Sequence, residues 1–309
     1  MREEPGLLEM IRAKFLFGIL PPIVVGTTTA VYTTGEFRLD GLLLVLFIGL
    51  SLQISMHVFN DIYDTMQGSD TDISMDSDYS GGSGVLVRYP ELRSKMLMIG
   101  RLSLAAALIG TLALVMLVHT DLWFLIILLV TLVIFLIIFY SASPVELAYR
   151  GLGEIAVWVG FGPAVVLIAS IGQNLGIHPT VIAVTPITGF STLFIAWMGE
   201  LVDLEWDRAA DKRGLVLILG LKKSHYVFLL IHIIALLNVV FVALFVFDPG
   251  YMILIALIPH AFLFPKYWHH VWNCDDKGHL EKAAKLNFWL YGLFSIALMV
   301  GFTINLFLF

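Results

Sequence analysis

The sequence predicts an all-α integral membrane protein with nine transmembrane helices around a central cavity. Two observations carry this prediction. The first is composition, because 59% of the 309 residues are hydrophobic and only 14% are charged, whereas soluble domains carry about 25% charged residues. The second is the length of the apolar runs, since a helix that crosses a bilayer needs ~20 mostly apolar residues.

Nine apolar runs reach about this length, and we expect them to form one domain over residues 1–309. The runs lie at 15–34, 41–60, 96–118, 121–140, 151–171, 178–200, 224–247, 249–266 and 286–308. The eighth is the weakest, because Pro259 and Pro265 interrupt a short apolar stretch. Residues 1–14 lack the cationic start and cleavage site of a signal peptide, so the first run is expected to be a retained helix.

The positions of the basic residues predict the orientation in the membrane. With nine spans, every Lys and Arg except Arg38 falls on the same side as the N-terminus. Because basic loops stay in the cytoplasm, we expect a multi-pass protein of the cell membrane with a cytoplasmic N-terminus. Two long acidic loops, 61–95 and 201–223, lie on this inner side. The single cysteine, Cys274, excludes an internal disulfide.

The net charge does not indicate a nucleic-acid partner. It is −6 at neutral pH, and the acidic residues gather in the two inner loops. A partner with phosphate backbones would need a basic surface. The acidic loops themselves are therefore the places to look for chemistry.

The first acidic cluster follows the second apolar run directly. The segment 60–72 holds one Asn and four Asp, a density that no lipid-facing helix tolerates. Asn60 and Asp64 are four residues apart, so they share one face if the helix continues through them. Such oxygen ligands suit a hard cation such as Mg²⁺. The cluster predicts a magnesium site for a phosphate-bearing substrate.

A second cluster follows the sixth run. Asp203, Asp207 and Asp211 repeat every four residues, which predicts that they line one helical face. Lys212 and Arg213 come next. Facing each other, the two clusters would hold two Mg²⁺ ions with a diphosphate between them, while the basic residues offset the remaining phosphate charge.

Two alternatives stay open at this point. Solvated helix ends would explain either cluster alone, but the matched spacing and common side favour a shared site. A divalent-cation channel or carrier would need polar groups deep in the membrane, and the spans between the clusters are almost free of acidic residues. The run 70–75 has no Gly at its sixth position, which argues against an EF-hand.

The motifs resemble a known superfamily. The pattern Asn60-Asp61-x-x-Asp64-x-x-x-Gly68-x-Asp70 is similar to the first aspartate-rich motif of the UbiA intramembrane prenyltransferases, and 200–213 is similar to the second. The segments 80–86 and 149–154 look like the menaquinone branch, the 1,4-dihydroxy-2-naphthoate prenyltransferases and their UBIAD-type relatives. The resemblance covers nearly the whole chain in order.

The resemblance implies a magnesium-dependent prenyltransferase. It would move a polyprenyl group from an allylic diphosphate, for example geranylgeranyl diphosphate, to an aromatic acceptor through an allylic cation. The first expected acceptor is 1,4-dihydroxy-2-naphthoate, in menaquinone biosynthesis. A digeranylgeranylglyceryl phosphate synthase-type activity is the main alternative; that branch carries an Asn-x-Pro-x-Arg-Pro segment that 72–78 lacks. The prenyl tail would lie among the apolar spans, with access to membrane lipid.

The resemblance also assigns roles to residues. The expected metal ligands are Asn60, Asp64, Asp203 and Asp207. The expected diphosphate-binding residues are Arg12, Lys14, Arg150, Lys212 and Arg213. Catalysis is expected from Asp64, Asp203 and Tyr140, whose ring would stabilise the allylic cation. The residues expected near the acceptor are His57, Asp61, Gly82, Ser83, Gly84, Glu200 and Asp211. His57 is alternatively a hydrogen-bonded interior histidine.

Overall fold

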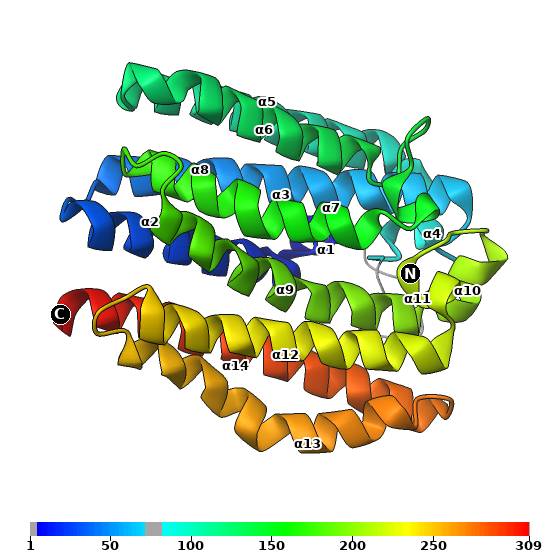
Figure 1. The fold of residues 1–309 in the computed structure, drawn as a ribbon. Coiled ribbons are helices and arrows are strands. Elements are labelled where there is room, and N and C mark those ends of the chain that lie inside the picture. Colours follow the sequence, from blue (N-terminus) through cyan, green and yellow to red (C-terminus); the bar gives the residue numbers. More distant parts are fainter. Residues whose placement is uncertain (1–4, 72–81, 309) are drawn as a thin grey trace.

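The computed structural model describes residues 5–71 and 82–308, and every regular element in these ranges is helical (Figure 1). The acidic residues Asp72, Asp76 and Asp78 lie outside the described residues. The first half of the chain forms η1 (Ala13–Ile19), α1 to α8, and the short elements between them. The bounds of its α-helices are α1 Leu7–Met10, α2 Leu20–Thr34, α3 Leu39–Gln67, α4 Val85–Arg88, α5 Arg93–Leu117, α6 Trp123–Phe139, α7 Gly153–Val159 and α8 Val165–Gly172.

The second half is also helical. Its α-helices are α9 Pro179–Val202, α10 Leu204–Ala209, α11 Leu215–Leu219, α12 Leu221–Phe245, α13 Ile258–Trp272 and α14 Lys277–Leu308. The remaining elements are 3₁₀ or π turns: η3 Pro90–Leu92, η4 Thr120–Leu122, η5 Leu147–Arg150, η6 Gly160–Ala164 and η7 Tyr251–Leu257.

The prediction of nine membrane spans is confirmed for the described part of the chain. Nine helical stretches are long and apolar enough to cross a bilayer, and each corresponds to one of the nine apolar runs. Many of their large apolar side chains face outward, such as Phe124, Phe262 and Phe307. Lipid rather than water suits that surface.

Glycines allow α3 and α2 to approach α8 closely. A side chain at Gly41 would collide with the carbonyl group of Gly172, and one at Gly26 would collide with the carbonyl group of Val166. Helices in membranes associate largely through such small-residue contacts, because lipid provides no hydrophobic force between them. This close packing fixes the inner helices around which the others are arranged.

The fifth span is irregular in the middle. The α-helix α7 passes into the π turn η6, which contains Pro163, before α8 resumes the span. Proline removes one backbone donor and displaces the preceding turn, and π turns often occur at functional sites. Gly160 and Phe161, at the start of this turn, line the cavity described below.

The second span extends further than its apolar run predicts. Helix α3 continues to Gln67 and ends at Gly68, whose φ of 83° allows its backbone N–H to donate to the carbonyl group of Asp64. Asn60 and Asp64 therefore lie on a continuous helix. Figure 1 shows that the end of α3 lies at the same end of the bundle as α10 and α11.

The single helical face predicted for the second acidic cluster is wrong. Helix α9 ends at Val202, Asp203 forms the junction, and α10 ends at Ala209. Asp211 follows with a φ of 55°, so it leaves the helical path. Its side chain is 87% exposed and lies 3.6 Å from Arg213. The cluster is thus divided between a buried part and a surface part.

Candidate active site

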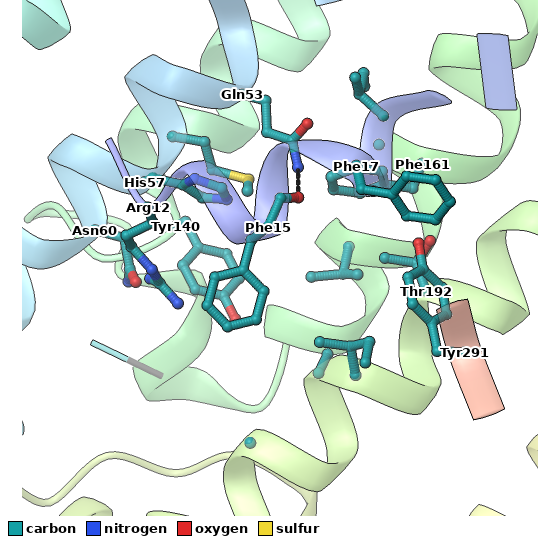
Figure 2. Close-up of a pocket in the computed structure, with 18 of the residues that line it drawn as sticks. Arg12, Phe15, Phe17, Gln53, His57, Asn60, Tyr140, Phe161, Thr192 and Tyr291 are labelled. Atoms are coloured by element: carbon teal, nitrogen blue, oxygen red, sulfur yellow. Dashed lines mark hydrogen bonds between the residues drawn. The ribbon is translucent and has the colours of Figure 1, made fainter. Parts of the chain in front are cut away.

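A cavity of about 510 Å³ lies between η1, α3, α6, α7, η6, α9 and α14. Figure 2 shows side chains from several of these elements pointing into it, with Arg12, His57 and Asn60 at one side and Phe17 and Phe161 at the other. Its lining from α3 runs from Gly49 to Asp64, a rise of about 22 Å along that helix. The cavity therefore connects the acidic end of the helix with the interior of the bundle.

The walls change from polar to apolar along the cavity. The polar and charged residues at the acidic end are Arg12, Lys14, Asn60, Asp64, Glu200, Asp203, Asp207 and Lys212. The apolar lining includes Phe15, Phe17, Leu52, Met56, Val133, Leu136, Ile137, Val157, Phe161, Val165, Ile195, Phe288, Leu293 and Ile296. Such a cavity suits a ligand with a charged head and a hydrocarbon tail.

Asn60 and Asp64 form the α3 part of the polar end. Asn60 Nδ2 donates to Asp64 Oδ2 at 2.9 Å and to Ser141 Oγ at 3.0 Å. Both amide hydrogens are then used, which leaves the Asn60 carbonyl oxygen as an acceptor or ligand. Asp64 Oδ1 accepts from the Tyr149 hydroxyl at 3.3 Å. These contacts hold the two side chains in the relation that a cation site needs.

Lys212 joins the two acidic clusters. Its Nζ lies 3.4 Å from Asp64 Oδ2 and 3.3 Å from Asp207 Oδ1. Burial alone would lower the pKa of Lys212, but the neighbouring carboxylates of Asp64 and Asp207 outweigh burial and raise that pKa well above its ordinary value. The lysine therefore stays protonated, and its positive charge lies between one carboxylate of α3 and one of α10.

The oxygen donors fit magnesium in type. Four carboxylates, those of Asp64, Glu200, Asp203 and Asp207, and the Asn60 amide line this end of the cavity. Oxygen is the ligand atom that Mg²⁺ prefers. Among the described residues, no three His, Cys, Asp or Glu side chains are close enough to hold a metal ion by themselves. Mg²⁺ at phosphate sites commonly uses one or two carboxylates together with substrate phosphates. The Lys212 ammonium already marks a place between Asp64 and Asp207 where positive charge is stabilised.

The five predicted diphosphate-binding residues separate into two groups. Arg12, Lys14 and Lys212 line the cavity. Arg150 and Arg213 do not; they line a separate surface depression together with Asp211. Arg150 is 59% exposed and lies 3.8 Å from Glu146. The loops after α6 and α10 turn these two arginines outward.

Two residues of the N-terminal segment, Arg12 and Lys14, line the polar end of the cavity. Arg12 has a φ of 53° and lies 3.5 Å from Asp61 Oδ1, and its guanidinium lies 4.9 Å from the Phe15 ring centre. Gln53 Nε2 donates to the Phe15 carbonyl group at 2.8 Å (Figure 2). These contacts tie η1 to α3 and hold the Phe15 ring within the cavity.

His57 and Tyr140 both line the cavity. His57 Nδ1 also lies 3.1 Å from the Ile11 carbonyl oxygen, so the histidine has an interior hydrogen bond and a face toward the cavity. Figure 2 shows Tyr140 and Phe15 among the side chains that line the cavity. Burial raises the pKa of the Tyr140 hydroxyl, so this ring is a neutral aromatic surface.

Asp61 and the glycine-rich segment lie beside the cavity rather than in its lining. Asp61 Oδ1 accepts from the Ser83 backbone N–H at 3.2 Å. Gly82 packs so closely against the Asp70 carboxyl group that a side chain there would collide with it. Gly84 has a φ of 67° and immediately precedes α4. These contacts join residues 82 and 83 to Asp61 of α3 and to Asp70, which follows the end of that helix.

Glu200 lines the cavity and has a buried neighbour that the sequence did not identify. Glu200 Oε2 accepts from the Val216 N–H at 3.1 Å, and Glu154 Oε1 accepts from the Leu215 N–H at 2.6 Å. The two carboxyl groups thus bind consecutive backbone donors at the start of α11. A side chain at Gly214 would collide with the Glu200 carboxyl group.

Tyr149 is a second residue of the site, after Glu154, to which the sequence alone assigns no role. Its hydroxyl contacts Asp64 and Ser69, and its ring lies 5.7 Å from Lys212 Nζ. The only signal in the sequence was its position in the segment 149–154, next to Arg150. Both residues line the surface depression, but only the tyrosine has a hydroxyl that reaches Asp64 in the cavity lining.

The chain belongs to the UbiA prenyltransferase family, whose sequence model matches residues 19–293. It is 27% identical over 201 residues to the 2-carboxy-1,4-naphthoquinone phytyltransferase of Synechocystis sp. (strain ATCC 27184 / PCC 6803 / Kazusa), a match that covers 65% of this chain and 62% of that relative. It is 26% identical over 218 residues to the 1,4-dihydroxy-2-naphthoate octaprenyltransferase of Bacillus subtilis (strain 168), covering 70% and 66%. The matches therefore span just under two thirds of each relative.

The fold is shared with solved members of the family. A UbiA homolog from Archaeoglobus fulgidus, bound to GPP and Mg²⁺, superposes with a TM-score of 0.65 at 16% identity. The superposition covers 97% of this chain and 99% of that one. The arrangement of the nine spans is thus that of the UbiA fold.

Proposed function

We propose that this protein is a magnesium-dependent membrane prenyltransferase that transfers a polyprenyl group from an allylic diphosphate to an aromatic acceptor. One observation carries the proposal: Asp64 and Asp207, from two distant acidic motifs, meet at Lys212 at the polar end of an otherwise largely apolar cavity. Family membership supports the same reaction class. We treat the whole chain as one catalytic domain.

The donor would bind with its diphosphate at the acidic end and its tail along the apolar walls. Arg12, Lys14 and Lys212, which line the cavity, would neutralise phosphate oxygens. Asn60, Asp64, Asp203 and Asp207 would hold Mg²⁺, with two ions as our expectation. Bound Mg²⁺ would supply Lewis acidity that stabilises the leaving diphosphate.

The aromatic side chains would stabilise the positive charge that develops on the donor. Tyr140 and Phe15 both line the cavity (Figure 2). Their rings would lie near the allylic carbon as its bond to the diphosphate oxygen breaks. Each cation–π contact contributes ~0.5–2 kcal/mol. The apolar lining limits water, which would otherwise capture the allylic cation.

The names of the two relatives favour a naphthoate-type acceptor. We propose 1,4-dihydroxy-2-naphthoate, in menaquinone biosynthesis, as the first acceptor to test. The ring carbon that gains the prenyl group would lie between Tyr140 and the acidic end, near His57 and Glu200. Geranylgeranylglyceryl phosphate is the alternative, and incubating the enzyme with both acceptors in one reaction decides between them.

The site would face the cytoplasm. With nine spans, every Lys and Arg except Arg38 would lie on the side of the membrane that carries the N-terminus and the acidic loops, and basic loops stay inside. This orientation gives a water-soluble diphosphate access to the polar end from the cytoplasm. The lipid-soluble tail and product would exchange with the cell membrane, beside Trp289 and Ile296, which line the cavity and are also exposed.

The test is prenyl transfer by the full-length protein in lipid nanodiscs. Geranylgeranyl diphosphate, Mg²⁺ and 1,4-dihydroxy-2-naphthoate should yield prenylated product and diphosphate, and EDTA should abolish both. Asp64→Ala should lose at least 100-fold in rate. Asp40→Ala is the matched control, because Asp40 lies on the same helix but outside the cavity. Wild-type protein that releases no diphosphate, or Asp64→Ala with full activity, would refute the proposal.

Divalent-cation flux into liposomes tests the transport alternative. The prenyltransferase proposal expects no flux above that of empty liposomes. Metal-dependent flux that Asp64→Ala removes, without any prenyl transfer by the wild type, would favour transport instead.

A further inference from the structure

Lys212 occupies the position that a metal ion would be expected to take. Its ammonium group contacts one carboxylate from each acidic cluster, at 3.4 Å and 3.3 Å. The Lys212 side chain is 16% exposed, and those of Asp64 and Asp207 are 7% and 6% exposed. Two carboxylates brought together with so little solvent need a positive charge between them.

The backbone of Lys212 is fixed, while its side chain is long enough to move. The Lys212 N–H donates to the Asp207 carbonyl group at 2.9 Å, which anchors the residue just after α10. Its ammonium is a compact charge on a flexible four-carbon chain. The Tyr149 ring lies 5.7 Å from Nζ, and the side chain also lines the cavity. The ammonium can therefore leave the two carboxylates without any movement of the helices.

We propose that Lys212 is a built-in counter-ion that holds the two acidic clusters together until Mg²⁺ and a diphosphate arrive together. This inference rests on the proposed function. Asp64 and Asp207 would then hold Mg²⁺, and the Lys212 ammonium released from them would pair with the diphosphate. Lys212 thus acts as a positioning residue before the reaction and as a phosphate ligand during it.

This arrangement predicts that Mg²⁺ and diphosphate bind cooperatively. Mg²⁺ alone must displace the Lys212 ammonium from both of the carboxylates that it neutralises, so the binding of Mg²⁺ alone is opposed. A diphosphate gives the ammonium a new partner and removes that cost. By linkage, each ligand must strengthen the binding of the other by the same factor. Lys212 would therefore weaken the binding of Mg²⁺ when no prenyl diphosphate is present.

The test uses thermal unfolding of the full-length protein in nanodiscs, with Mg²⁺ and inorganic pyrophosphate as probes. For the wild type, Mg²⁺ alone should shift Tm little, and Mg²⁺ with pyrophosphate should shift it by several degrees. Lys212→Met keeps the alkyl chain but removes the charge. In EDTA its Tm should be lower than that of the wild type, and Mg²⁺ alone should restore it with a half-maximal concentration at least tenfold lower.

Two further variants separate this role from simple packing. Lys212→Arg keeps the charge, so it should retain the wild-type need for pyrophosphate. Lys223→Met removes an exposed lysine outside the site and should behave as the wild type. The proposal is overturned if Mg²⁺ alone stabilises the wild type fully, or if Lys212→Met binds Mg²⁺ no more tightly. These measurements need no prenyl donor or acceptor, so they can fail while prenyl transfer is confirmed, and the reverse.

Discussion

The hydroxyl group of Tyr149 donates to Asp64 Oδ1 at 3.3 Å and lies 3.0 Å from Ser69 Oγ. Together with Asn60, it holds the Asp64 carboxylate from two sides, with Lys212 at a third. The carboxylate is therefore oriented before any ligand binds. Preorganised groups of this kind contribute most where charge develops during a reaction.

Tyr149→Phe should reduce Mg²⁺-dependent prenyl transfer about tenfold, because a hydrogen bond to a charged group contributes ~1.5–3 kcal/mol. Steady-state rates over a range of Mg²⁺ concentrations measure the effect. Tyr226→Phe is the control, since Tyr226 is 61% exposed on α12 and should be silent. A Tyr149→Phe enzyme with the wild-type rate would show that the hydroxyl has no role.

Asp207 and Asp211 are four residues apart but should respond very differently to substitution. Asp207 is buried beside Lys212, whereas Asp211 is 87% exposed. Asp207→Asn should lower the rate of prenyl transfer at least 100-fold, and Asp211→Asn should leave it within twofold. Parallel assays of both variants in the same nanodisc preparation check this. Equal losses would contradict the division of the cluster.

The sequence predicted the spans well because the bilayer imposes a length and an apolar composition that need no tertiary information. It also placed the two acidic motifs after the spans that bring them together. The continuous helical face through Asp203, Asp207 and Asp211 failed because spacing alone does not reveal that α9 ends at Val202 or that Asp211 has a positive φ.

Loop orientation explains the other differences. Arg150 and Arg213 are basic residues next to the motifs, so composition made them equal candidates with Lys212. Only the paths of the loops place Lys212 inside and the two arginines outside. Glu154 was not assigned a role for a similar reason. Its hydrogen-bond donor, the Leu215 N–H, lies 61 residues away in the sequence.

Asp70 should make the stability of the metal-free protein depend on pH, with the free energy of unfolding decreasing as the pH rises. Burial, followed by the charges of Asp64 and Asp61, raises the pKa of Asp70 to about 8. An unfolded chain loses this proton near pH ~4. Between these values the folded state holds a proton that the unfolded state has lost, so the free energy of unfolding falls with rising pH.

Asp70→Asn should remove this dependence, because the amide stays neutral with nearly the same shape. Tm in EDTA, measured from pH 5 to pH 8, should fall more steeply for the wild type than for the variant. If the two profiles run parallel, Asp70 is not the group that responds.

Cys274 should react slowly with alkylating reagents in the folded protein. It is buried beside His225, with Sγ 3.3 Å from Nε2, and burial raises the pKa of its thiol to about 11. Since the thiolate is the reactive form, iodoacetamide labelling at pH 8 should be about 100-fold slower than in denatured protein. Mass spectrometry over time measures both rates, with Cys274→Ser as the blank. Equal rates would show that the thiol is accessible and ionised normally.

Gly41 should be essential for packing rather than for chemistry. A methyl group there would collide with the Gly172 carbonyl group, which faces it from the end of α8. Gly41→Ala should therefore separate α3 from α8 and lower the free energy of unfolding by about 1–3 kcal/mol. Gly292→Ala is the matched control, because a methyl group on that part of α14 meets nothing within 4 Å. The control should be neutral or stabilising by up to ~1 kcal/mol, since alanine favours helix more than glycine does. Thermal unfolding in nanodiscs distinguishes the two, and a Gly41→Ala protein as stable as the Gly292→Ala protein would mean that α3 and α8 do not pack through this contact.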